Sequence, residues 1–189
     1  MLRINDVYQY QDLSIRILKI LSEHIVWIDI NDMKALPEII SKTEIFHAIE
    51  SFEVFRIEDP FQEIALIQPE KDSTSQRKRD QNYNLIKAIV DHEQFYIPSI
   101  RSSLINEIIN NKKSTKQTIY RLLRQYWQRG QTPNALIPNY QNSGAKGSKK
   151  VARQKLGRKR THKEGTGAII TQEIERLFHL TISKYLLSN

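Results

Sequence analysis

Apolar residues in the first third of the 189-residue chain recur at the spacing of β-strands. The runs 15–20 and 25–30 are rich in β-branched residues with partial two-residue alternation, and a polar turn at 22–24 separates them. This pattern predicts a hairpin with one buried face. Residues 1–70 are therefore expected to form a small β barrel or sandwich with one helix. The other expected elements are a strand at Val7-Tyr8, a helix opened by Pro37, a strand over 52–57 and one more over 61–67.

A helical pattern follows a short polar segment, 71–76, whose composition predicts a linker. Three amphipathic helices are expected in the next domain, 77–140. The second begins at Pro98, because proline is favoured at the first helical position. The third is capped by Thr115 or the serine before it, and Gly130 ends it. The short turn before the third helix is typical of a helix-turn-helix domain.

The periodicity is lost after these helices. Residues 141–165 contain nine lysines and arginines, four glycines and one acid, which predicts a basic flexible linker over 141–169. A last helix, capped by Thr171, is expected within 170–189. Its apolar stripe has no evident partner, so we expect either that these residues are the front of a longer protein or that the helix docks on a surface supplied in trans. The expected fold class is α+β and multidomain.

Composition excludes several classes of protein. The chain has no cysteine, which rules out disulfide scaffolds, thiolate zinc sites and cysteine nucleophiles. No apolar run approaches the ~20 residues of a transmembrane helix. Asp6 interrupts the N-terminus before a signal sequence can build. We therefore expect a cytoplasmic protein, associated with the nucleoid when bound to DNA.

Charge is distributed unevenly along the chain. The first 70 residues carry 6 basic and 13 acidic side chains, a net charge of −7, and the remaining 119 carry 23 and 8, a net charge of +15. Such an asymmetry attracts polyanions, and nucleic acid is the leading candidate. A membrane surface is disfavoured because we find no exposed aromatic face on an amphipathic helix and no lipidation signal.

The third helix of the expected helix-turn-helix has the polarity of a recognition helix. Its polar face is basic and rich in amides, and no acid occurs from 112 to 163. Arginine can bind guanine through two hydrogen bonds and glutamine can bind adenine in the same way. The candidates for major-groove base contacts are Lys116, Gln117, Tyr120, Arg121 and Arg124. The candidates for phosphate contacts are Arg101, Lys112, Lys113 and Thr115. The alternative is a basic, solvated helix of an ordinary bundle.

The linker supplies a second set of candidate DNA contacts. A flexible basic arm can lie in the minor groove, where narrow A·T tracts deepen the negative potential. Other bases of the arm would contact phosphates. These minor-groove or backbone candidates are Lys146, Lys149, Lys150, Arg153, Lys155, Arg158, Lys159 and Arg160. The alternative is a spacer that its charge keeps soluble.

Signals of catalysis are missing from the sequence. Gly144 to Lys150 superficially resembles a phosphate-binding loop, but its second glycine and lysine are misplaced for that motif. The five histidines are scattered without the spacing of a metal site. The acid pairs Asp29 with Asp32 and Glu58 with Asp59 are expected in turns or on the surface. We therefore predict no catalytic residue, no metal site and no cofactor in these 189 residues.

Residues 120–138, reading YRLLRQYWQRGQTPNALIP, resemble the N-terminal part of the TnsB-type transposases. The similarity continues in order through most of the chain, at 4–7, 26–27, 58–60, 142–144 and 171–187. The resemblance implies recognition of repeated sites at transposon ends, with cutting and joining by a magnesium-dependent DDE catalytic domain. That domain would lie beyond Asn189, and none of its carboxylates can be assigned here. The resemblance also implies that the last helix, within 170–189, opens a further, truncated DNA-binding domain. Implied partners are transposon-end DNA, other transposition proteins and further copies of the chain.

Two other functions stay open at this stage. A free-standing helix-turn-helix transcriptional regulator would use the same recognition physics, with the acidic β domain as a sensor or dimerisation domain. A protein that binds structured RNA would use the basic linker equally well, although side chains cannot read the deep major groove of an RNA duplex. The acidic β domain should be repelled by a bare duplex, so we expect it to contact protein or to brace the helical domain.

Overall fold

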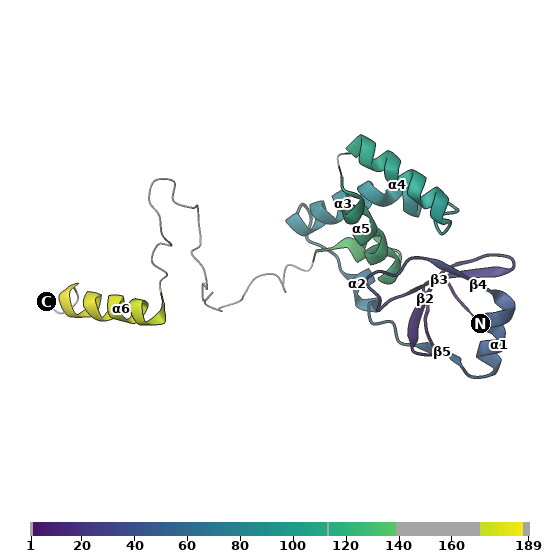
Figure 1. Cartoon of the computed structure of the whole chain (residues 1–189), viewed down its shortest axis with the longest axis horizontal. Coiled ribbons are helices and arrows are strands. Elements are labelled where there is room, and N and C mark those ends of the chain that lie inside the picture. The colour runs from purple at the N-terminus through teal and green to yellow at the C-terminus, as the bar shows by residue number, and fades with distance from the viewer. Residues whose placement is uncertain (1, 113, 139–170, 187–189) are drawn as a thin grey trace, which may run out of the picture. The chain divides into compact units, whose positions relative to one another are not determined.

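The computed structural model describes residues 2–112, 114–138 and 171–186 (Figure 1). The chain divides into two compact units, residues 1–139 and 140–189. In the second unit the described residues form one helix, α6 (Gln172–Leu186). Within the described part of the chain, no helix combines the length and apolar character needed to cross a bilayer.

The first unit opens with an antiparallel five-stranded sheet in the order β4-β3-β2-β1-β5. The predicted hairpin is confirmed as β2 and β3, with Ile17 paired to Trp27 and Ile20 to Ile25. Helix α1 (Lys42–Glu50) contacts both edge strands, β4 and β5, and so links the two ends of the sheet. The strands are β1 (Val7–Tyr10), β2 (Leu13–Ile20), β3 (His24–Asp29), β4 (Glu38–Ser41) and β5 (Val54–Ile57).

Two elements of this region differ from the prediction. Pro37 precedes strand β4, whose Ile40 pairs with Ile25 and is buried. The helix begins at Lys42, five residues after Pro37. The side chain of Ser41 caps that helix by accepting from the Thr43 amide at 3.2 Å. Residues 61–67 form the short helix α2 (Gln62–Leu66) and no strand. These segments are short, so pairing with β3 and tertiary contacts outweighed their local pattern.

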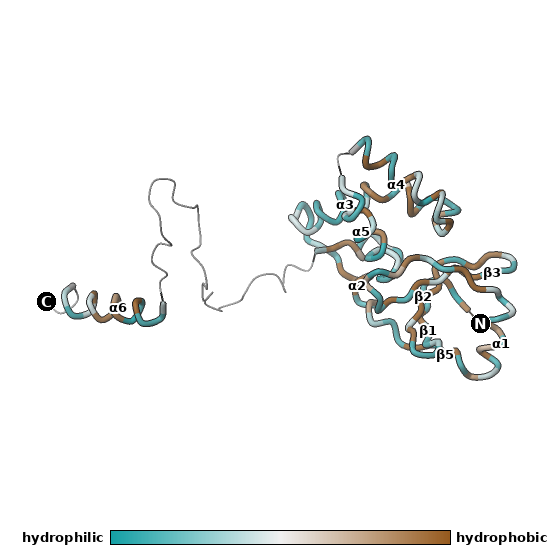
Figure 2. Tube along the Cα trace, viewed as in Figure 1, coloured by the Kyte–Doolittle hydropathy of each residue, from teal (hydrophilic) through white to brown (hydrophobic). Residues whose placement is uncertain are grey.

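Both faces of the central hairpin are buried, which corrects the expectation of one buried face. One face of β2 and β3 packs against the helices that follow in sequence, and the other packs against α1. Near-continuous apolar runs are typical of strands covered on both sides, and the hydropathy tube in Figure 2 shows such a run along β3. The helix-facing residues are Leu18, Val26 and Ile28, and those on the α1 side are Ile15, Ile17, Ile25 and Trp27.

The helical region contains the three predicted helices. They are α3 (Thr74–Val90), α4 (Pro98–Lys112) and α5 (Lys116–Gln128), followed by a short 3-10 helix, η1 (Pro133–Leu136). The second begins at Pro98, as predicted. Gly130 follows the end of α5 with a φ of +101°, a conformation that favours glycine. The first helix begins within the predicted linker, because Ser73 caps it by accepting from the Gln76 amide.

The sheet and the helices share one hydrophobic core, so the predicted β-rich and helical domains pack against each other within one compact unit. The indole of Trp127 on α5 is fully buried and stacks on Phe95 with ring centroids 5.5 Å apart. Side chains of β2 and β3 belong to the same cluster. The orientation of α5 is therefore set by the β-sheet as well as by its neighbouring helices.

Helix α6 is amphipathic, with alternating bands of hydropathy in Figure 2. Thr171 caps it, as predicted, by accepting from the Ile174 amide at 3.4 Å. Leu177 and Phe178 are 62% and 68% exposed. Its apolar stripe is thus open to solvent in the described part of the second unit.

Candidate nucleic-acid interface

Helix α5 is strongly amphipathic, and its apolar face anchors it in the core. Five side chains of that face are buried: Ile119, Leu122, Leu123, Tyr126 and Trp127. Its N-terminus is capped by Thr115, whose hydroxyl oxygen accepts from the Thr118 amide at 3.2 Å. The cap fixes where the helix starts, and the buried stripe fixes which face it presents to solvent.

Three of the five predicted base-contact residues lie exposed on the polar face of α5. Lys116 and Gln117 stand in the first turn, and Arg121 follows one turn later. Residues at i and i+4 lie on the same side of a helix, so Gln117 and Arg121 are neighbours on one surface. Together the three side chains offer an ammonium, an amide and a guanidinium, which can donate to guanine, adenine or phosphate.

The other two predicted base-contact residues are partly buried and interact with the fold. The guanidinium carbon of Arg124 lies 5.6 Å from the centre of the Tyr120 ring, a cation–π distance. Arg124 Nε also donates to the Ala35 carbonyl, at 3.2 Å, in the segment between β3 and β4. These contacts restrict both side chains, so their free donors are fewer than the sequence suggests.

Arg101 is a correction to the predicted phosphate contacts. It is only 3% exposed, and its Nη1 donates to the carbonyls of Phe95 and Tyr96 at 3.2 and 3.3 Å. Its side chain also interacts electrostatically with Tyr120. Burial lowers the pKa of the Arg101 guanidinium, and the Tyr120 contact partly offsets that shift. The turn between α3 and α4 folds over this residue, which helical periodicity did not reveal.

The remaining phosphate and linker candidates differ in where they lie in the chain. Thr115 is exposed but serves as the cap of α5. Lys112 is the last residue of α4. Lys113 and the eight predicted linker contacts, Lys146, Lys149, Lys150, Arg153, Lys155, Arg158, Lys159 and Arg160, lie outside the described residues. Their roles therefore stay predictions.

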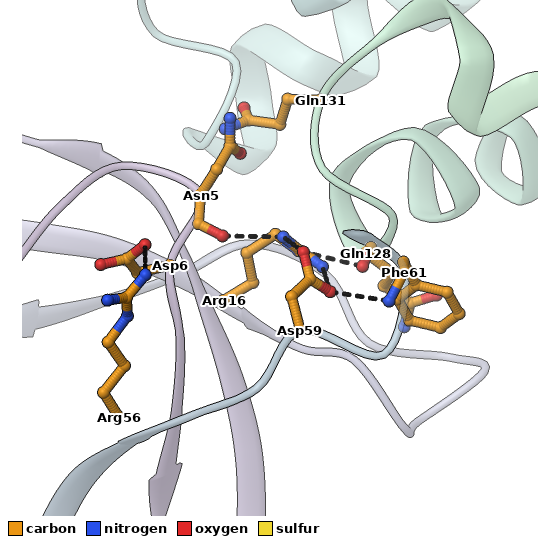
Figure 3. A network of polar contacts seen from close by, with 8 residues as sticks. All are labelled: Asn5, Asp6, Arg16, Arg56, Asp59, Phe61, Gln128 and Gln131. Atoms are coloured by element: carbon orange, nitrogen blue, oxygen red, sulfur yellow. Dashed lines mark hydrogen bonds and ion pairs between the residues drawn. The ribbon is translucent and has the colours of Figure 1, made fainter. Parts of the chain in front are cut away.

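The C-terminal end of α5 is fastened to the β-sheet by a buried polar network that the sequence did not predict (Figure 3). Arg16 on β2 is fully buried, and its Nε donates to the Gln128 carbonyl at 3.0 Å. Its Nη1 donates to the Asn5 carbonyl at 2.7 Å, and Nη1 and Nη2 bind both oxygens of the Asp59 carboxylate at 2.8 and 2.6 Å. A single arginine thus ties three segments to the end of α5. The available signal was an arginine flanked on both sides by isoleucines within a strand.

The Asp59 carboxylate is held in its charged form. Burial would raise its pKa, but hydrogen bonds from Arg16 and from the Phe61 amide, with the charge of Arg16, outweigh burial and lower the pKa below its ordinary value. Asp59 is thereby engaged as a structural partner of arginine. Among the described residues, no cluster of three or more His, Cys, Asp or Glu side chains could hold a metal ion.

A second set of contacts joins α5 to the segment between β3 and β4. Gln128 Nε2 donates to the carbonyls of Asp29 and Asp32, at 2.9 and 2.7 Å. The neighbouring Gln131 donates to the Asn5 side chain and the Leu18 carbonyl. The polar face of α5 is consequently free at its N-terminal half and covered by the β domain at its C-terminal half.

Comparison with known proteins identifies both parts of this unit. Residues 1–60 match the TnsB N-terminal SH3-like domain, and residues 79–140 match the TnsB second domain. The whole chain is 40% identical to the Tn7 transposition protein TnsB of Escherichia coli, of which it covers 27%. The chain thus spans about a quarter of the length of that relative. The chain belongs to the TnsB family, of which it contains the N-terminal SH3-like domain and the second domain.

Proposed function

We propose that this chain binds double-stranded DNA sequence-specifically at transposon ends, with α5 in the major groove. The observation that carries the proposal is the exposed face formed by Lys116, Gln117 and Arg121 on a capped, rigidly anchored helix. The N-terminal turns of a recognition helix read bases in helix-turn-helix proteins. Here those turns carry donors that suit base edges, and the opposite face of the helix is buried.

The relative's description as a transposition protein favours transposon ends as the site, over the operator of a free-standing regulator. In the proposed function, the compact unit of residues 1–139 positions a magnesium-dependent DDE catalytic domain on the DNA. Other transposition proteins and further copies of the chain would join it there. The chain itself supplies recognition and no chemistry.

Selection from a random pool of 20-base-pair duplexes tests sequence-specific binding and identifies the bound site in one experiment. The chain is expected to enrich one motif and to bind it about 10³-fold or more tightly than a scrambled duplex at physiological salt. An RNA duplex of the selected sequence should bind no better than the scrambled DNA. Equal affinity for all three would refute sequence-specific DNA binding.

Arg121→Ala tests the recognition helix directly. Loss of a bidentate contact should cost about 1–3 kcal/mol on the selected duplex and relax the preference at one or two positions. Arg77→Ala, an exposed arginine on α3, is the matched control and should keep the preference. If the Arg121 variant discriminates between duplexes as well as the parent does, α5 is not the reading element.

A further inference from the structure

We infer that the segment joining β3 to β4, residues 30–37, is a second DNA-contacting element and that Lys34 at its tip binds a backbone phosphate beside the major groove. The inference rests on the proposed function, because it takes α5 as the helix in the groove. It assigns a DNA contact to the acidic SH3-like domain, which charge alone would keep away from a duplex.

The segment 30–37 is attached to α5, the proposed recognition helix. Arg124 Nε donates to the Ala35 carbonyl at 3.2 Å, and Gln128 Nε2 donates to the Asp32 carbonyl at 2.7 Å. Leu36 packs against the core that α5 shares with the sheet. Three contacts over five residues fix the segment along the C-terminal half of the polar face of α5.

The tip of this segment forms a hydrogen-bonded turn that faces solvent. The Asp32 carboxylate accepts from the Lys34 amide at 2.8 Å and so closes the turn. Met33 is 86% exposed, and Lys34 is exposed beside it. The Lys34 ammonium therefore projects from a fixed backbone position one residue away from the Arg124 contact.

A recognition helix leaves little free space in the major groove. The major groove is about 12 Å wide, and an α-helix with its side chains is about 10–12 Å across, so a helix in the groove fills it. Whatever lies beside the exposed face of that helix must meet the phosphates at the groove edge. Lys34 occupies this place, as the one cation among residues 30–37, and lysine is suited to a phosphate as a point charge. The segment between β3 and β4 would thus be a second DNA-contacting loop beside the helix, supplied by the SH3-like domain.

Charge substitutions within the turn test this assignment by salt titration of DNA binding. Lys34→Gln should lower the slope of log affinity against log salt by about 0.9, the value for one phosphate contact, and leave the sequence preference unchanged. Asp32→Asn retains an oxygen that can accept from the Lys34 amide and removes a negative charge, so it should tighten binding at low salt. Lys42→Gln, on the opposite side of the sheet at α1, is the matched control and should not change the slope.

Affinity cleavage gives an independent readout. Because the chain has no cysteine, one introduced cysteine is the single thiol to which a cleavage reagent can be attached. An iron-chelate cleavage reagent on Lys34→Cys should cut the DNA backbone beside the cuts made from Gln117→Cys. The same reagent on Glu50→Cys, at the end of α1, should leave the DNA intact. Side chains at all three positions are exposed, so folding should be retained, and circular dichroism checks it.

The outcomes separate the two proposals. An unchanged slope for Lys34→Gln, or cleavage from position 34 as weak as from position 50, overturns the second contact whatever Arg121→Ala does. Failure to select any motif overturns sequence-specific recognition. The slope and cleavage tests still decide the Lys34 contact in that case, because phosphate contacts are present on any duplex.

Discussion

The buried pair of Arg16 and Asp59 yields a prediction whose size follows from the structure. Asp59→Asn keeps an oxygen that can accept from the Phe61 amide, but it removes the charge that neutralises Arg16. The arginine then remains fully buried without a counter-charge, with the Asn5 and Gln128 carbonyls and one neutral amide oxygen at position 59 as its acceptors. Breaking one side of a buried pair costs about 3–5 kcal/mol, and we expect the lower end because the Asp59 side chain is 24% exposed.

Chemical denaturation with urea, followed by circular dichroism, measures this loss. In thermal unfolding of a chain of this size, a loss of about 3 kcal/mol corresponds to a fall in Tm of roughly 6–12 °C. The matched control is Arg56→Gln, which breaks the neighbouring pair with Asp6, 2.9 Å apart and drawn in the same view (Figure 3). Arg56 is 63% exposed, so its loss should cost under about 1 kcal/mol. Equal losses in the two variants would refute the argument from burial.

Two further predictions concern the same end of the unit. The pKa of Asp59 is lowered in the folded state, so the stability it contributes is present above the ordinary carboxyl pKa and is lost as pH falls through the folded value. Urea titrations at pH 7 and pH 3 measure the free energy of unfolding at each pH. Its decrease from pH 7 to pH 3 should be smaller for Asp59→Asn than for the parent. Gly130→Ala should cost about 1–2 kcal/mol, because a Cβ there has room but a φ of +101° strains any other residue, and thermal unfolding monitored by circular dichroism measures it.

Much of the architecture could be predicted from local signals. Alternation and β-branching indicated the β2–β3 hairpin, while Pro98, Thr115 and Gly130 indicated where helices begin or end. The exposed cations at the start of α5 followed from the same periodicity. These features depend on residues near each other in sequence, where steric preference and capping act directly.

Other features depended on contacts between distant residues. Arg101 is a surface cation by periodicity, yet a neighbouring turn buries it. Arg124 was predicted to read bases, and the β3–β4 segment 89 residues earlier engages one of its donors. Arg16 was an unexplained charge within a strand until the end of α5 and Asp59 came to lie around it. Burial and partner choice of a long polar side chain are set by what packs over it.

The sequence by itself determined the type of the main elements, the charge asymmetry and the family. The tertiary structure alone decided that the SH3-like sheet and the helices share one core, and therefore that the sheet holds α5 in place. The physical reason is that apolar residues on a strand indicate that its face is buried, but they do not indicate which element covers that face. The second face of β2 and β3 is satisfied by helices that lie some 60 to 110 residues further along the chain.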